Sequence, residues 1–214
     1  MHKKNSEKID ENLYQIKKVY DPFLRILHWW NALAIFSLML TIWIKPALKE
    51  FENWKEVLYH FHTYLGYGLI CGITLRVLWG VIGPEHAKFI NMFNFNVYLN
   101  FFKTRKIQFK NDWGHDAFAG TVYLKIYFIL ILQCISGLYL SAKIFGIGPF
   151  NTFVELSKEK TLVRKIFKES HEIIFYILMA FIAIHIFMLI YTEIKHKFPL
   201  AQSMLSGYQY RRKK

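Results

Sequence analysis

Four long stretches of this sequence are apolar and nearly free of charge, and each is long enough to cross a bilayer as a helix. A membrane-spanning helix needs about 20 mostly apolar residues, because backbone groups without hydrogen bonds are costly in lipid. Hydrophobic residues make up 54% of the chain, which is too apolar for an ordinary soluble domain. The sequence therefore predicts one all-α integral membrane domain over residues 1–214, an up-and-down four-helix bundle. The predicted spans are 24–44, 59–82, 118–140 and 172–191.

The formal charge of +13 is spread between the apolar stretches and the two ends of the chain. This pattern fits lipid headgroups, and we expect no nucleic acid partner. Lysine and arginine are more frequent at the two ends and in the 83–117 loop than in the other two loops, so both termini are predicted to be cytoplasmic. The first twenty residues lack the apolar core of a secretory signal, and we expect them to be retained. The segment 141–170 is predicted to be an amphipathic surface stretch that either meets a partner or serves as a connector.

Four histidines lie within the predicted spans or at their ends: His28, His62, His171 and His185. An ionisable side chain at membrane depth is rare and indicates function. A b-type haem needs imidazole nitrogens on both axial faces, presented from facing helices, so four such histidines predict two haems. The last two are fourteen residues apart, which on a helix is a rise of about 21 Å on nearly the same face.

The predicted topology pairs these histidines by membrane depth. His62 and His171 would hold an outer haem, and His28 and His185 an inner one. His60 is an alternative to His62 that points about 200° away on the helix; we choose His62 because it lies deeper and has Gly66 one turn away. Hydrogen bonding between helices remains the alternative role for any one of these histidines.

Three cations also lie within or against the spans. Arg76 falls near the same helix face as His62 but at the opposite depth, so it is a candidate to neutralise a propionate of the inner haem. Snorkelling to the headgroups is an equal alternative for Arg76, and it is the favoured reading for Arg25 and Lys125.

Several sequence motifs carry a resemblance to a known family. With these motifs the chain resembles the cytochrome b subunit of membrane-bound nickel-iron hydrogenases, within the wider bacterial di-haem cytochrome b family. The haem-ligand motifs are shared with formate dehydrogenase membrane subunits, whereas GHDAFAG and SMLSGY favour hydrogenase. The family more often has Asn and Pro where this chain has Asp116 and Ala117. The motifs are VYDPFLRILHWWNALAI, FHTYLGYGLICGITLRVLWGVIG, GHDAFAGTVYLKIYF, HEIIFYILMAFIAIH and SMLSGYQYR.

The resemblance implies the same four axial ligands and a place in the bacterial cytoplasmic (inner) membrane. It implies an electron-transfer subunit that does not activate hydrogen on its own. Such a subunit anchors a periplasmic hydrogenase, with its small iron-sulfur and large subunits, and passes electrons from the outer to the inner haem and on to a quinone, commonly menaquinone. Candidate quinone contacts by location are His115, Arg76 and Lys125.

Two other interpretations remain open from the sequence. In the same fold, the chain would be the cytochrome b of another dehydrogenase, such as formate dehydrogenase, or a stand-alone quinol-linked cytochrome. In a different class, it would be a haem-free membrane anchor or small transporter.

Overall fold

The computed structural model describes residues 14–48, 50–92, 117–154, 161–196 and 200–212. Within this part of the chain, four helices are long and apolar enough to cross a membrane. They are α1 (Pro22–Ile44), α2 (Glu52–Ile82), α4 (Ala117–Phe145) and α5 (Leu162–His196). The prediction of an all-α membrane bundle of four helices is confirmed.

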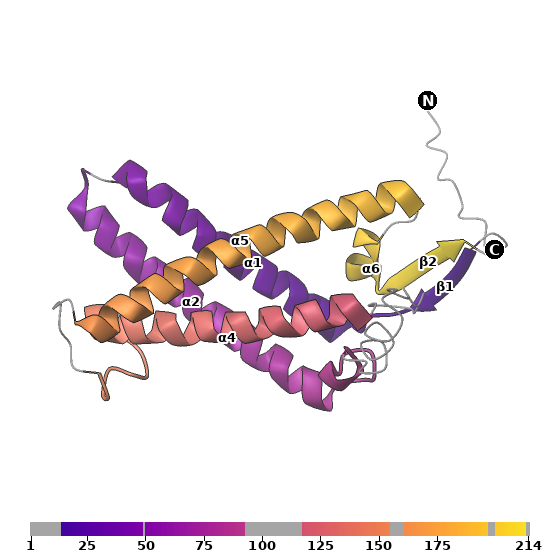
Figure 1. Ribbon diagram of the computed structural model, residues 1–214, viewed down its shortest axis with the longest axis horizontal. Helices are drawn as coiled ribbons and strands as arrows, with labels where there is room; N and C mark the ends of the chain where they lie inside the picture. Colours follow the sequence, from indigo (N-terminus) through magenta and orange to yellow (C-terminus); the bar gives the residue numbers. More distant parts are fainter. Residues whose placement is uncertain (1–13, 49, 93–116, 155–160, 197–199, 213–214) are drawn as a thin grey trace, which may run out of the picture.

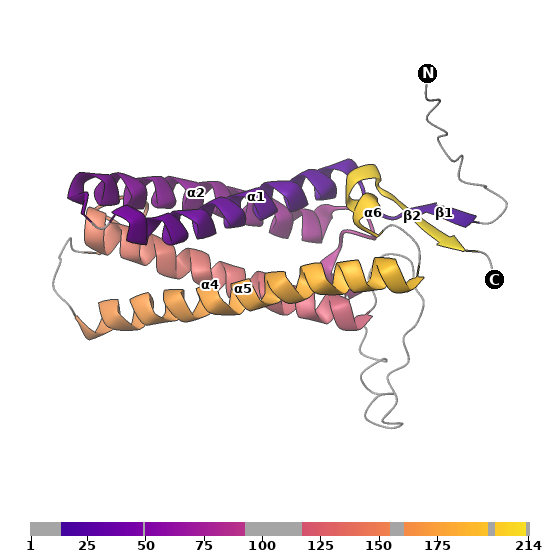
Figure 2. The ribbon, with the colours of Figure 1, turned by 90° about the horizontal axis from the view of Figure 1, so that it is seen from above.

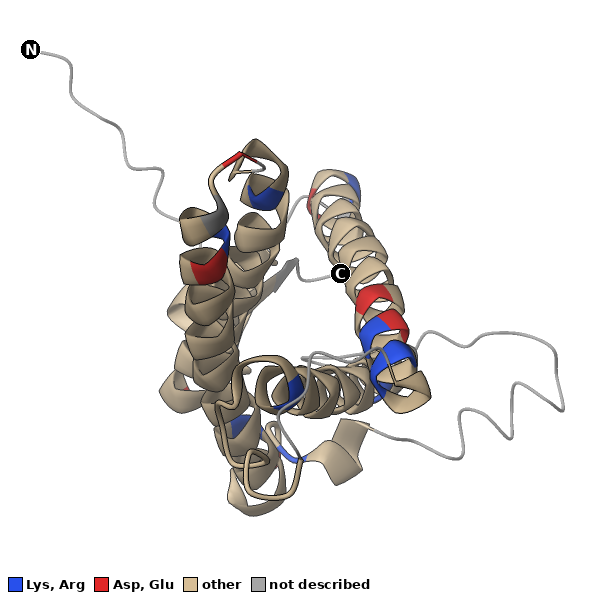
Figure 3. Ribbon diagram, turned by 90° about the vertical axis from the view of Figure 1, so that its left-hand side faces the viewer, with Lys and Arg blue, Asp and Glu red and all other residues tan. Residues whose placement is uncertain are grey.

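The four helices form two antiparallel hairpins that lie in two layers. Figure 2 shows α1 and α2 in one layer and α4 and α5 in the other. Helix α1 packs on α2, α2 on α4, and α4 on α5. Only 6% of the residues in the most apolar stretch of α5 are buried, whereas 22–28% are buried in the corresponding stretches of the other three helices. Helix α5 therefore contacts little besides α4, and it stands off from α1 and α2 when the bundle is viewed along its length (Figure 3).

The helices extend beyond the predicted spans. Helix α2 begins at Glu52 rather than near residue 59, and α5 begins at Leu162 rather than near residue 172. At about 1.5 Å per residue, the 35 residues of α5 measure about 52 Å, well over the roughly 30 Å of hydrocarbon. The predicted surface stretch 141–170 is thus helical at both of its ends, because amphipathic turns can continue a helix outside the hydrocarbon.

The two ends of the chain meet in a small antiparallel sheet that sequence analysis did not predict. Strand β1 (Tyr14–Lys18) pairs with β2 (Tyr208–Arg212), so that Lys18 lies opposite Tyr208. Both strands lie at one end of the bundle (Figure 1), as expected for an even number of spans. That this end is cytoplasmic stays a prediction.

Short elements complete both ends of the bundle. The 3₁₀ helix η1 (Lys45–Leu48) joins α1 to α2, and η2 (Phe89–Met92) follows α2. Helix α6 (Ala201–Ser206) docks on α1, where Trp29 Nε1 donates to the Met204 carbonyl at 3.1 Å and Arg25 donates to the Leu205 carbonyl. Arg25 therefore has a protein partner, because α6, distant in sequence, brings a backbone carbonyl within its reach. That Arg25 snorkels to the headgroups stays a prediction.

Asp21 begins α1 and ties it to the end of α2. Its Oδ1 accepts the Leu24 amide at 2.9 Å, and its Oδ2 accepts the Trp79 indole N–H at 3.3 Å and lies 3.0 Å from His86 Nε2. Burial alone would raise the pKa of Asp21, but these hydrogen bonds outweigh it and hold the pKa below its usual value. Pro22 follows at the first helical position, where its missing N–H is not needed.

The buried side chains form two clusters, of which the second joins the two layers. At the end that carries both strands, Val19, Tyr20, Leu24 and Ala87 form one buried cluster. In the middle of the bundle, the second buried cluster joins α2, α4 and α5 and consists of Leu69, Ile73, Leu130 and Leu178. The second cluster borders the site described next.

Candidate functional site

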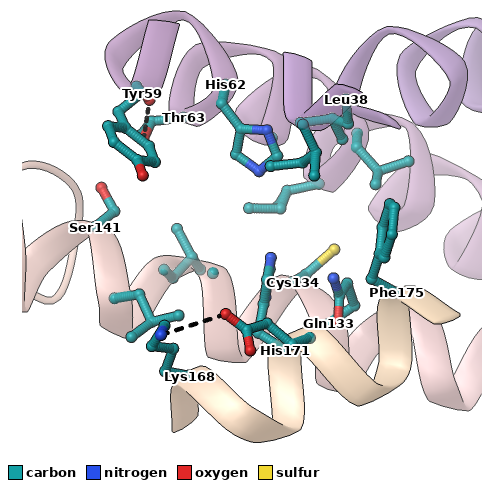
Figure 4. A pocket seen from close by; sticks show the side chains of 18 of the residues that line it. Leu38, Tyr59, His62, Thr63, Gln133, Cys134, Ser141, Lys168, His171 and Phe175 are labelled. Atoms are coloured by element: carbon teal, nitrogen blue, oxygen red, sulfur yellow. Dashed lines mark hydrogen bonds and ion pairs between the residues drawn. The ribbon is translucent and has the colours of Figure 1, made fainter. Parts of the chain in front are cut away.

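Two histidines from different layers face each other across the bundle. His62 projects from α2 and His171 from α5, and Figure 4 shows their rings pointing toward one another across a cavity. Their ring centroids are 6.4 Å apart. Two imidazoles on opposite sides of one metal have centroids about 6.3 Å apart, because each metal–nitrogen bond is about 2.0 Å long and each centroid lies about 1.15 Å beyond its nitrogen. The spacing fits one iron held between the two rings.

Each of the two rings is oriented by a buried hydroxyl on the neighbouring helix of its own hairpin. Thr41 Oγ1 lies 2.7 Å from His62 Nδ1, and it donates its proton to the Leu38 carbonyl at 2.6 Å. Because that proton is used, Oγ1 accepts at His62, whose Nδ1 must carry the hydrogen. The lone pair of His62 is then on Nε2, the nitrogen that a metal would bind.

The second hairpin repeats this arrangement. Ser136 Oγ lies 2.9 Å from His171 Nδ1 and donates to the Gln133 carbonyl at 2.9 Å. The same reasoning gives His171 a protonated Nδ1 and a free Nε2. Both Thr41 and Ser136 are only 4% exposed, so water does not compete for these hydrogen bonds. The chemistry of this donor set is that of two neutral axial imidazoles.

The cavity between the two histidines has a volume of about 580 Å³, within the usual range for ligand sites. It lies between both layers and is lined by all four long helices. Leu69, Leu130 and Leu178 line its inner part, and Gly66 leaves open space, since a Cβ there would meet nothing within 4 Å. The cavity therefore has the apolar walls and the depth that a flat macrocycle needs.

Of the two neighbouring histidines on α2, only His62 lies on this cavity. The ring of His60 packs against Phe145, with centroids 5.2 Å apart, and its Nε2 is 3.9 Å from the Glu56 carboxylate. The choice of His62 over His60 agrees with this geometry.

The second predicted pair, His28 and His185, lies toward the opposite end of α1 and α5. His28 lies on α1, where its ring packs edge-on against Trp29, with centroids 5.5 Å apart. The His185 ring stacks on Phe181, with centroids 5.8 Å apart and planes 20° apart, and Tyr123 lies edge-on at 6.1 Å. Aromatic side chains thus surround His185, and among the described residues no ring contact joins it to His28, so this pairing stays a prediction.

Arg76 is one of the most deeply buried side chains of the described part of the chain, at 2% exposed. Its Nη2 donates to the Ala87 carbonyl at 3.2 Å, and its guanidinium lies 4.4 Å from the ring centroid of Phe89 and 5.3 Å from that of Tyr127. Its Nε and Nη1 have no hydrogen-bond partner among the described residues. This burial argues against snorkelling for Arg76, and the two unpartnered donors suit a carboxylate.

The other predicted cations and the last histidine are placed differently. Lys125 is exposed on α4, in agreement with snorkelling. His115, a candidate quinone contact, lies outside the described residues.

Sequence analysis missed Thr41 and Ser136. They precede their histidines by 21 and 35 residues, so no local motif joins them. The one available signal was a hydroxyl residue within a span at the depth of a histidine.

The family model described as prokaryotic cytochrome b561 matches residues 19–207, which covers all four long helices. No curated protein and no solved structure matches the chain. The chain therefore belongs to the prokaryotic cytochrome b561 family of membrane electron-transfer proteins, which implies b-type haem and a multi-pass bacterial membrane protein.

Proposed function

We propose that this chain is the membrane electron-transfer subunit of a respiratory nickel-iron hydrogenase. It would anchor the periplasmic enzyme in the cytoplasmic membrane and pass electrons from its iron-sulfur subunit through two b haems to a quinone. The resemblance implies menaquinone as that quinone. The observation that carries the proposal is the His62 and His171 pair, facing at 6.4 Å with both Nδ1 atoms held by buried hydroxyls. The name of the matching family model, which joins nickel hydrogenase to cytochrome b, supports the choice of partner.

The chain's own residues would bind, orient and shield two redox centres. His62 and His171 would hold one haem, and His28 and His185 the other. Haem supplies reversible one-electron chemistry at its iron. His171 and His185 are separated by about 21 Å along α5, a large part of the roughly 30 Å hydrocarbon thickness. The two sites would therefore connect the two faces of the membrane.

Arg76 would neutralise a propionate of the haem held by His28 and His185. A guanidinium buried with two unpartnered N–H donors is expensive unless an anion is present, and a carboxylate matches its fork of donors. Loss of this charge by Arg76→Met should lower the reduction potential of that haem.

Haem content and single-ligand variants test the proposal. The protein purified in detergent should show two low-spin b haems per chain in a reduced-minus-oxidised spectrum. His62→Ala and His171→Ala should remove the same haem, and His28→Ala and His185→Ala the other. A preparation with no haem would favour the haem-free anchor or transporter, and loss of one common haem in the His28 and His62 variants would refute the pairing.

The partner is tested in native membranes. Hydrogen should reduce both haems, and a quinone should reoxidise them. If formate reduces the haems and hydrogen does not, the chain serves a formate dehydrogenase. If only a quinol reduces them, it is a stand-alone cytochrome.

A further inference from the structure

The charged side chains that line the cavity between His62 and His171 all lie at one end of it. Its inner part is formed by Leu69, Leu130 and Leu178, three members of the buried central cluster. The part nearest the α1–α2 and α4–α5 connections is lined instead by charged side chains. These are Lys45, Arg164, Lys168 and Glu172. Figure 3, which faces this end of the bundle, shows both basic and acidic residues on the near turns of α5.

A haem placed between the two histidines has one charged edge, which bears its two propionate carboxylates. Ionised carboxylates are strongly disfavoured in an apolar environment without a partner. The leucine-lined part of the cavity offers the neutral amide of Gln133 but no cation among the residues that line it, whereas the charged part offers three cations. Resting on the function proposed above, we propose that the propionate edge of this haem faces outward onto a cationic rim formed by Lys45, Arg164 and Lys168.

The spacing along α5 supports this orientation. Arg164, Lys168 and His171 are placed at i, i+4 and i+7, so the helix face that presents the axial ligand also presents the two cations. Lys165 follows Arg164 directly and therefore projects in a different direction from the helix, and it does not line the cavity. The propionate-binding face and the iron-binding face of α5 are thus the same face.

The three cations of the rim are not equivalent. Arg164 is half-buried on the cavity and carries a planar fork that matches a carboxylate. Lys168 lies 3.5 Å from the Glu172 carboxylate (Figure 4), which offsets part of its charge. Lys45 comes from the opposite layer, with its Nζ 5.2 Å from the Tyr59 ring centroid. Because Arg164 is half-buried and has a planar fork of donors, it is assigned the strongest propionate contact, and Lys45 is assigned the contact from the other side.

Reduction adds an electron to the iron, so nearby positive charge stabilises the reduced form and Glu172 opposes it. In Arg164→Met the ratio of reduced to oxidised haem at a fixed applied potential should fall about three- to tenfold. This change corresponds to a potential lower by about 30–60 mV, at 59 mV per tenfold for one electron. Lys45→Met and Lys168→Met should shift the potential in the same direction by less, and Glu172→Gln should shift it in the opposite direction.

The matched control is Lys165→Met, which removes the same charge from the neighbouring position, where the side chain is 69% exposed. Spectroelectrochemistry of the purified protein would measure the reduction potentials of both haems in one experiment. An unchanged potential of the haem held by His28 and His185 would show that the variant is correctly folded. The proposal requires a shift in Arg164→Met with less than a twofold change in Lys165→Met. Equal shifts in these two variants, or no shift in any rim variant, would overturn it. If Arg164→Met does not fold, Lys45→Met on another helix decides the question.

The two proposals fail in different ways. A wild-type protein without haem refutes the proposed function. If the wild-type protein holds two haems and the rim variants leave both reduction potentials unchanged, only the proposed orientation of the haem is refuted.

Discussion

Removing the hydroxyls that orient His62 and His171 should weaken haem binding at that site without disturbing the bundle. The two changes are Thr41→Val and Ser136→Ala, each of which keeps most of the side-chain volume. Each leaves a buried Nδ1–H without its hydroxyl acceptor, and frees the ring to turn away from the position that suits the iron. The expected result is faster loss of one haem and unchanged retention of the other.

The magnitude follows from one hydrogen bond for each variant. A neutral hydrogen bond contributes about 1 kcal/mol, which is about fivefold in affinity at 1.4 kcal/mol per factor of ten. Loss of an orienting partner from a metal-bound histidine typically weakens metal binding about 10–100-fold. A backbone carbonyl also lies near each ring, that of Leu38 near His62 and that of Gln133 near His171, which favours the lower figures. We expect about five- to twentyfold for each single variant and a larger loss for the pair.

Transfer of haem to an excess of an apo-globin scavenger, followed by visible absorbance, measures this effect directly. The phase that belongs to this site is identified as the one missing from His171→Ala. Thr63→Val is the matched control, because the Thr63 hydroxyl donates to the Tyr59 carbonyl at 3.0 Å next to His62 in sequence. Wild-type transfer rates in both Thr41→Val and Ser136→Ala, or an equal acceleration in Thr63→Val, would refute the reasoning.

Three further predictions test the cavity, the packing and the helix start. Gly66→Leu should lower haem content at this site while leaving the thermal stability of haem-free protein unchanged or slightly raised, because its side chain would enter open space on a helix. Gly72→Val should lower the melting temperature in detergent, since its Cβ would lie 2.5 Å from a Trp30 ring carbon. Because the folded pKa of Asp21 is depressed, its contribution to stability is present above the ordinary carboxyl pKa and lost as pH falls through the folded value. Asp21→Asn should therefore flatten the acid side of a melting-temperature profile, and an unchanged slope would contradict this.

The four spans and the placement of His171 and His185 on one helix face could be predicted from the sequence. The reason is that both depend on short-range regularities. Apolar stretches long enough for a bilayer can be counted directly, and the helical period relates two residues on one helix whatever surrounds them.

Other features depended on how distant segments meet. The docking of α6 gives Arg25 a carbonyl partner, and the pairing of β1 with β2 joins segments almost a whole chain apart. The burial of Arg76 likewise comes from packing against Phe89 and Tyr127. From its position in a predicted span alone, snorkelling to the headgroups was an equal alternative.

The cavity between His62 and His171 likewise combines features that the sequence predicts with features that only the tertiary structure decides. From the sequence alone, histidines on three helices could be identified and paired by depth. Only the tertiary structure decides that His62 rather than His60 faces His171, that Thr41 and Ser136 hold the two rings, and that cations line one end of the cavity. Periodicity sets angles within a helix, whereas the rotation of one helix against another is set by side-chain packing along the whole length of both.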